Sequence, residues 1–182
     1  MKHLLTILLI FLSAGSTFAV SVGEIVPEIK VQGWINSNPL TLHALRGKLV
    51  VLEFWATWCP PCRRSIPHLI RLYKKMKDKP LAFLSLTSEP KSRILQFNRK
   101  NPDLKMPYPV GYGSRSSSRF EVQGIPHAFV IDKNGKLIWR GHPMSPGFEK
   151  AIQRALHIKK TTTSPTSGNR RGKDEGSDDK DG

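Results

Sequence analysis

The sequence predicts an α/β fold in which a mixed central sheet carries helices on both faces and is preceded by an N-terminal hairpin. Two apolar segments, 49–55 and 81–86, are typical of central strands that are covered on both faces. An amphipathic segment separates them, as in a strand–helix–strand unit. Asn134-Gly135 then joins two further strand segments, and both residues tolerate positive φ in a tight hairpin turn.

The first half of the domain contains three predicted strands and one helix. Segments 29–34 and 40–42 are expected to form the N-terminal hairpin. The strand at 49–55 is apolar except for Glu53 and runs directly into Trp58-Cys59-Pro60-Pro61-Cys62. A helix is predicted from Pro61, because proline is tolerated in a first turn where no intrahelical donor is needed. Its inward positions recur at helical spacing, and Pro67 is expected to kink it; these positions are Ile66, Leu69, Ile70, Tyr73 and Met76.

The second half of the domain is predicted to contain a strand, a helix, a hairpin and a closing helix. The strand at 81–86 is followed by a helix at 90–100. Residues 101–119 are rich in Pro, Gly, Ser and Arg, so loops with a short strand around Val110 are expected there. Strands at 128–132 and 136–140 flank Asn134-Gly135. The last helix, 148–158, is expected to point Phe148, Ile152, Ala155 and Leu156 inward.

The two ends of the chain are expected to lie outside the folded domain. Residues 1–19 combine a short basic start, an apolar run and small residues at Thr17 and Ala19, which is typical of a secretory signal. An uncleaved anchor is the alternative, but crossing a bilayer takes about 20 apolar residues and this run is shorter. Residues 159–182 contain no Leu, Ile, Val or aromatic residue and predict a disordered polar tail. The folded domain is therefore placed at 20–158, in a periplasmic or other extracytoplasmic compartment.

The domain is strongly basic. Residues 20–158 contain 22 Lys and Arg residues and 9 Asp and Glu residues, a net charge of +13 out of +15 for the whole chain. Such a field favours acidic protein surfaces and anionic lipid as partners. The basic residues are dispersed without interleaved aromatic residues, so nucleic acid is not an expected partner. We expect a monomer.

The only cysteines of the chain are Cys59 and Cys62. A disulfide that stabilises a secreted protein usually closes a longer loop, so this pair predicts a redox-active disulfide that needs no other cofactor. At a helix N-terminus, the dipole and the free backbone donors lower the pKa of a thiol, and Arg63 and Arg64 add positive charge. Cys59 is therefore the predicted exposed, attacking thiol, and Cys62, which is better shielded, is the resolving thiol.

A metal site is the alternative interpretation of the cysteine pair. Zinc sites of this kind take about four protein ligands, and the sequence has no second cysteine pair. His68 and His127 are the remaining candidate ligands, but His68 falls on a helix six residues after Cys62. We expect no bound metal.

Two segments carry a family resemblance. The first, Glu53-Phe54-Trp55-Ala56-Thr57-Trp58-Cys59-Pro60-Pro61-Cys62 with Pro67, resembles the active-site segment of the thioredoxin superfamily. The second, Phe120-Glu121-Val122-Gln123-Gly124-Ile125-Pro126 followed by a strand and Asp132-Lys133-Asn134-Gly135, is similar to the second signature of that superfamily. The resemblance extends over residues 22–158 and is strongest to the TlpA/ResA-like branch of exported thiol-disulfide oxidoreductases. It implies a thioredoxin-like fold.

The resemblance also implies roles for particular residues. Pro126 matches a cis-proline that lies beside the cysteines, and Ile125 before it would hold the main chain of a substrate. Glu53 matches a buried acid beneath the cysteines, where it would relay protons with a raised pKa; a solvated glutamate at a strand edge is the alternative. Trp58 is expected to flank the active site as a substrate-binding residue.

One position departs from the pattern. Some TlpA/ResA-like proteins carry an acidic residue three positions after the second cysteine, where this chain has Ser65, so Glu53 is the only nearby acid in this segment. The expected function is reduction of disulfides in exported proteins, with apocytochrome c as one candidate substrate and a membrane protein as the electron donor. An oxidase that introduces disulfides and a non-catalytic module that binds a metal or a protein partner stay open as alternatives.

Overall fold

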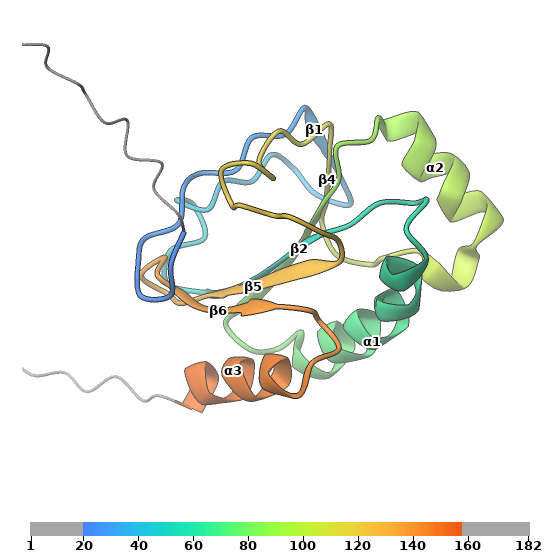
Figure 1. Ribbon diagram of the computed structural model, residues 1–182. Coiled ribbons are helices and arrows are strands. Elements are labelled where there is room, and N and C mark those ends of the chain that lie inside the picture. The colour runs from blue at the N-terminus through green and yellow to red at the C-terminus, as the bar shows by residue number, and fades with distance from the viewer. Residues whose placement is uncertain (1–19, 158–182) are drawn as a thin grey trace, which may run out of the picture.

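The computed structural model describes residues 20–157, in which a six-stranded mixed sheet has the order β1-β4-β3-β2-β5-β6 (Figure 1). The predicted signal segment and polar tail lie outside the described residues. No helix within 20–157 is both long and apolar enough to cross a membrane. In chain order the elements are β1 (Gly33–Ile35), β2 (Leu49–Phe54), α1 (Pro60–Met76), β3 (Leu81–Leu86), α2 (Lys91–Lys100), the short 3₁₀ helix η1 (Pro102–Leu104), β4 (Val110–Tyr112), β5 (His127–Ile131), β6 (Leu137–Gly141) and α3 (Pro146–His157).

β2 lies at the centre of the sheet, as its apolar sequence predicts. All six of its residues are buried, and it runs parallel to β3 and antiparallel to β5. Because β5 is antiparallel, its first residue, His127, pairs with the last residue of β2, Phe54. This register places the segment before β5, which contains Pro126, beside the C-terminal end of β2, from which the chain leads into Cys59.

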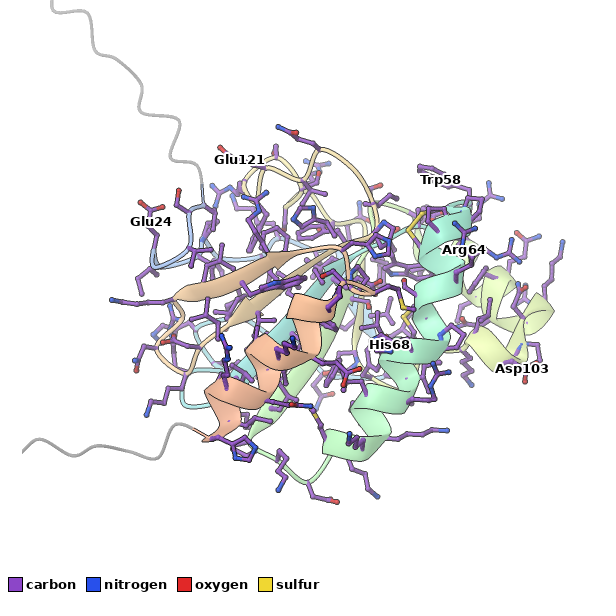
Figure 2. The ribbon with its side chains drawn as sticks, turned by 60° about the horizontal axis from the view of Figure 1, so that its bottom comes forward. Glu24, Trp58, Arg64, His68, Asp103 and Glu121 are labelled. Carbon is purple, nitrogen blue, oxygen red and sulfur yellow. A yellow bond between two sulfur atoms is a disulfide. The ribbon has the colours of Figure 1, made fainter. Side chains whose placement is uncertain are left out.

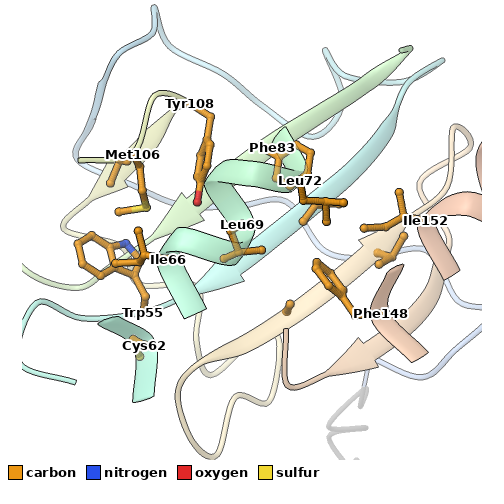
Figure 3. Packing of buried hydrophobic residues seen from close by; sticks show 14 of the residues in the cluster. Trp55, Cys62, Ile66, Leu69, Leu72, Phe83, Met106, Tyr108, Phe148 and Ile152 are labelled. Atoms are coloured by element: carbon orange, nitrogen blue, oxygen red, sulfur yellow. The ribbon is translucent and has the colours of Figure 1, made fainter. Parts of the chain in front are cut away.

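α1 packs its apolar side against one face of the sheet. Its buried residues include Ile66, Leu69 and Met76, as predicted, together with Leu72, whereas Ile70 is only partly buried. Figure 3 shows side chains of α1 packed with those of β3, α3 and the segment before β4 in a single cluster. Pro67 lies inside this helix. The helix begins at Pro60, one residue before the predicted start.

The prediction of helices on both faces is wrong. Buried residues from all three α-helices, such as Ile66, Ile94 and Phe148, belong to the same core cluster on one face. The cluster on the other face contains no residue from a helix. Its covering side chains come from the N-terminal segment and from a turn before β5, and include Val26, Ile29, Leu42, Leu45 and Phe120. Irregular segments bury enough apolar surface here to replace a helix.

The predicted N-terminal hairpin is also wrong. β1 is a short strand that pairs antiparallel with β4, Ile35 opposite Val110, and residues 40–42 form no strand. The carboxylate of Glu28 explains the difference, because it accepts hydrogen bonds from the backbone N–H groups of Leu42 at 2.7 Å and His43 at 3.0 Å. These donors are thereby satisfied without a partner strand.

The hairpin between β5 and β6 is confirmed, with one change in its turn. Gly135 adopts a φ of +80°, but Asn134 does not adopt a positive φ. The carboxylate of Asp132 instead accepts hydrogen bonds from the backbone N–H groups of Asn134 at 2.9 Å and Lys136 at 2.8 Å. The turn therefore depends on one glycine and one aspartate side chain.

Candidate active site

Cys59 and Cys62 form a disulfide at the start of α1, with their Cα atoms 5.3 Å apart. Cys59 is the N-cap residue, in extended conformation, and its Sγ accepts a hydrogen bond from the backbone N–H of Cys62 at 3.2 Å. The predicted placement of Cys59 at a helix N-terminus is therefore confirmed. A negative charge on this sulfur would face a backbone donor and the positive end of the helix dipole.

Both cysteines are buried in this oxidised state. Cys59 exposes 2% of its surface and Cys62 exposes none, so the expectation of an exposed Cys59 is wrong for the disulfide form. The loop before β5 lies against the bond, and the carbonyl oxygen of Ile125 is 3.6 Å from Cys59 Sγ. Trp58, the residue before Cys59, is instead 70% exposed.

The Ile125–Pro126 peptide is cis, as the resemblance implies. Trp58 and Ile125 both line a pocket of about 400 Å³, so the structure brings these two predicted residues together beside the disulfide. The other walls of the pocket are uncharged: they are apolar side chains or carry hydroxyl and amide groups, as in Thr87, Ser114 and Gln123. This arrangement offers a polypeptide an exposed indole, a main-chain segment and an uncharged recess next to the sulfurs.

Glu53 is a buried acid beneath the cysteines, so the alternative of a solvated strand-edge glutamate is wrong. Glu53 is 1% exposed, and its carboxylate accepts hydrogen bonds from the hydroxyls of Ser85 at 2.9 Å and Ser65 at 3.4 Å. Burial raises the pKa of Glu53 to about 7, against the opposing effect of the two serine hydrogen bonds. The Ser65 hydroxyl also lies 2.8 Å from the carbonyl oxygen of Cys62, which links the acid to the cysteine segment.

A second carboxylate near the site was not predicted. Glu89, just beyond β3, accepts hydrogen bonds from the backbone N–H of Thr57 at 2.6 Å and from its hydroxyl at 2.7 Å. It also accepts one from the hydroxyl of Thr87 at 3.2 Å. Thr57 precedes Trp58 and Cys59, so Glu89 fixes the segment that leads into the disulfide. The signal available in the sequence was an acid three residues after the end of β3, a central strand that neighbours β2.

Replacement of Glu89 tests this anchoring. Glu89→Gln keeps the shape but removes the negative charge that accepts both Thr57 hydrogen bonds, so the free energy of unfolding is expected to fall by about 1–2 kcal/mol. Urea denaturation measures the change, with Asp103→Asn, an exposed acid in η1, as the control. An equal loss in both variants, or a loss in Glu89→Gln that persists undiminished in a Thr57→Val background, would contradict the anchoring.

The two histidines considered as metal ligands have other neighbours. His68 Nε2 lies 3.7 Å from Glu149 Oε1 on α3. His127 Nε2 accepts a hydrogen bond from Nε of Arg140 at 3.4 Å, and burial, Arg140 and His142 lower the pKa of His127. Between residues 20 and 157, no group of three or more His, Cys, Asp or Glu side chains is arranged to hold a metal ion.

The fold and the site identify the class of protein. A disulfide between the N-cap residue of a helix and its first turn, facing a cis-proline loop, is suited to reversible exchange with other thiols. The helix start stabilises the first sulfur as a thiolate, and the second sulfur is already in reach. The protein is a thioredoxin-like thiol-disulfide oxidoreductase. The AhpC/TSA family matches residues 22–140, and the chain belongs to this family.

Curated relatives agree with this class. The chain is 31% identical over 119 residues to thiol-disulfide oxidoreductase ResA of Bacillus cereus, an alignment that covers 65% of this chain and 68% of the relative. It is 32% identical over 120 residues to ResA of Geobacillus kaustophilus, with the same two coverages.

Solved structures agree as well. A Chlorobium tepidum protein, provisionally assigned as the thiol:disulfide interchange protein DsbE, superimposes with a TM-score of 0.67 and 26% identity over 76% of this chain and 99% of its own. A Bacteroides thetaiotaomicron protein, provisionally assigned as a protein disulfide isomerase, gives a TM-score of 0.65 and 26% identity over 75% and 91% of the two chains.

Proposed function

We propose that the protein reduces disulfides in other polypeptides outside the cytoplasm, with Cys59 as the attacking thiol and Cys62 as the resolving thiol. The observation that carries the proposal is the placement of Cys59 as the N-cap of α1, beside the cis Ile125–Pro126 peptide. In the reduced protein, the backbone N–H of Cys62 and the helix dipole would stabilise a Cys59 thiolate and lower its pKa.

The exchange takes place in two displacements. The Cys59 thiolate attacks one sulfur of the substrate disulfide, whose S–S bond breaks; a mixed disulfide forms and the other substrate sulfur leaves as a thiolate. Cys62 then attacks Sγ of Cys59, which breaks the mixed disulfide and releases the second substrate thiol. The substrate gains two electrons and two protons, and Cys59–Cys62 is oxidised. A dithiol on a membrane donor is proposed to return the protein to its reduced state.

Glu53 is proposed to serve the second displacement. Cys62 must lose its proton before it can attack, and Glu53, with a pKa of about 7, exists in both protonation states near neutral pH. Ser65, which contacts both the Glu53 carboxylate and the Cys62 carbonyl, lies between the two groups. The carboxylate would accept the Cys62 proton and return it when the disulfide is reduced again.

Substrate main chain is proposed to bind along Ile125, with Pro126 shaping the loop and Trp58 packing against substrate side chains. The exposed indole of Trp58 supplies apolar contact area, and Ile125 presents its backbone next to Cys59. The signal-like composition of residues 1–19 supports the proposed extracytoplasmic location. Apocytochrome c, as in cytochrome c maturation, is one substrate of this chemical class, and the protein is proposed to act as a monomer.

The reduction potential of the Cys59–Cys62 pair tests the direction of the exchange. We expect a value close to that of reducing thioredoxins, about −270 mV, and clearly more negative than the value of about −120 mV found in strong oxidants. Equilibration with glutathione or dithiothreitol buffers measures it, and insulin reduction by excess dithiothreitol provides a rate. A potential near that of the oxidants would identify an enzyme that introduces disulfides. Redox inactivity toward insulin and toward small disulfides would favour a binding module instead.

A further inference from the structure

A group of exposed cations lies next to the disulfide. Arg63 and Arg64 are the fourth and fifth residues of α1, and Arg99 and Lys100 are in the last turn of α2. We call these four residues the basic face. Figure 2 shows Arg64 close to Trp58 at the start of α1, with α2 running alongside.

The two halves of the basic face are held together by Arg63. Its guanidinium donates a hydrogen bond from Nη2 to Oδ1 of Asn101, the residue that ends α2, at 3.1 Å. The same guanidinium lies over the ring of Phe97, 5.6 Å from the ring centroid. Arg63 follows Cys62 directly, so these contacts fix the end of α2 against the segment that carries the disulfide. The position of the basic face relative to the sulfurs is therefore set by the fold.

The two arginines at the start of α1 run against what a stable helix prefers, whereas Arg99 and Lys100 at the end of α2 suit the helix dipole. The N-terminal turn of a helix favours acids, yet the first turn of α1 contains no acid, and arginines are its fourth and fifth residues. No Asp or Glu occurs anywhere from Phe54 to Lys77 or within α2. The two contacts of 4 Å or less between a basic group and a carboxylate within residues 20–157 are His68–Glu149 and Arg140–Glu121, so none of the four cations is paired with a carboxylate there. Positive charge at the start of α1 costs helix stability, which indicates a functional requirement for it beside the disulfide.

We infer that the basic face is a docking surface for an acidic polypeptide segment that flanks the substrate disulfide. The inference rests on the proposed function and names the chemistry of its substrate. Cys59 is the N-cap of α1, so acidic residues beside a substrate disulfide bound there would lie near Arg63 and Arg64. Acidic residues further along the segment would meet Arg99 and Lys100. An anionic membrane fits less well, because a face pressed against lipid would close off the disulfide.

The test uses a charge reversal in α2 with a matched control in α1. Arg99→Glu with Lys100→Glu changes two cations in the last turn of α2, and Lys74→Glu with Lys75→Glu changes two in the last turn of α1, at the end away from the cysteines. Both double variants alter net charge and helix-end charge equally. The substrates are disulfide peptides that differ only in having acidic or neutral flanks.

The readout is the ratio of kcat/KM on the acidic peptide to kcat/KM on the neutral peptide. The α2 double variant is expected to lower this ratio about tenfold, because two attractions become repulsions, and the α1 control is expected to change it less than about twofold. In the unaltered protein the ratio should also fall as salt rises from low to physiological concentration.

If both double variants lower the ratio equally, the attraction comes from the positive charge of the whole domain and the inference is overturned. A ratio that is unchanged in the α2 double variant would also overturn it. The α2 double variant is also tested for binding to phosphatidylserine vesicles. If it loses more vesicle binding than acidic-peptide reduction, the partner of the basic face is a membrane and not a peptide. Failure of the proposed function itself gives a different result, since the unaltered protein would then reduce neither peptide.

Discussion

Replacement of Cys59 with serine is expected to abolish disulfide reduction, with a fall in rate on the order of a thousandfold or more, because the variant lacks the attacking sulfur. Cys62→Ser is expected to lose turnover as well but to accumulate mixed disulfides, since Cys59 can still attack and nothing resolves the product. The two variants thus differ in what they trap. Non-reducing electrophoresis after incubation with a disulfide substrate measures the adducts, and mass spectrometry locates the bond.

The assignment of the two sulfurs depends on that difference. A control with both cysteines replaced should trap nothing, and the circular dichroism of all three variants should match that of the reduced, unaltered protein. Equal trapping by Cys59→Ser and Cys62→Ser would contradict the assignment, as would trapping by Cys59→Ser alone. Equal trapping would mean that either sulfur can attack, and trapping by Cys59→Ser alone would move the attacking role to Cys62.

Glu53→Gln is expected to stabilise the protein at alkaline pH. The pKa of Glu53 is about 7 in the folded protein, against 4.5 for the same carboxyl when it is solvated in the unfolded chain, so the folded protein holds a proton that the unfolded chain releases between these values. The stability associated with this proton is complete below pH 4.5 and is lost as the pH rises through 7. At 1.36 kcal/mol for each pKa unit, the loss above pH 7 is about 3 kcal/mol.

Glutamine removes this penalty because it is never ionised. The free energy of unfolding of Glu53→Gln should therefore exceed that of the unaltered protein by about 2–3 kcal/mol at pH 8 and match it near pH 4.5. Urea denaturation at both pH values checks this, with Asp78→Asn, an exposed acid, as the control that should show no such gain. A variant less stable than the unaltered protein at pH 8 would show that the carboxylate is stabilised by its serine partners more than it is penalised by burial.

The same variant is expected to exchange more slowly. Without an acid beneath Cys62, the second displacement loses its proton acceptor, and the change of rate with pH around 7 should disappear with it. Single-turnover rates of disulfide release as a function of pH measure this loss. A gain in stability together with a loss of rate would identify Glu53 as a residue kept for catalysis, whereas an unchanged pH profile would remove it from the mechanism.

The sequence was most informative where a feature depends on neighbouring residues. The buried strand before Cys59, the N-cap position of Cys59 and the hairpin at Gly135 all follow from local patterns, and the structure contains each of them. The cis peptide before Pro126 came from the family resemblance, because no periodicity distinguishes it from an ordinary turn proline.

The features that were missed depend on contacts between distant segments. β1 pairs with β4, more than seventy residues away, and Glu28 rather than a partner strand satisfies the backbone of Leu42. Glu89 reaches Thr57 across 32 residues. Irregular segments cover the second face of the sheet, and amphipathic periodicity does not reveal irregular structure. The burial of Cys59 in the disulfide form likewise depends on a loop that follows it by more than sixty residues.

Titration of the Cys59 thiol in the reduced protein tests the central claim most directly. In Cys62→Ser, Cys59 is the only remaining thiol, so the pH dependence of its alkylation by iodoacetamide gives its pKa alone. Stabilisation by the start of α1 and by Arg63 and Arg64 predicts a pKa well below the value of about 8.5 for a free cysteine. A pKa at or above that value, with alkylation no faster than that of an unstructured thiol, would contradict the proposed catalytic role of Cys59.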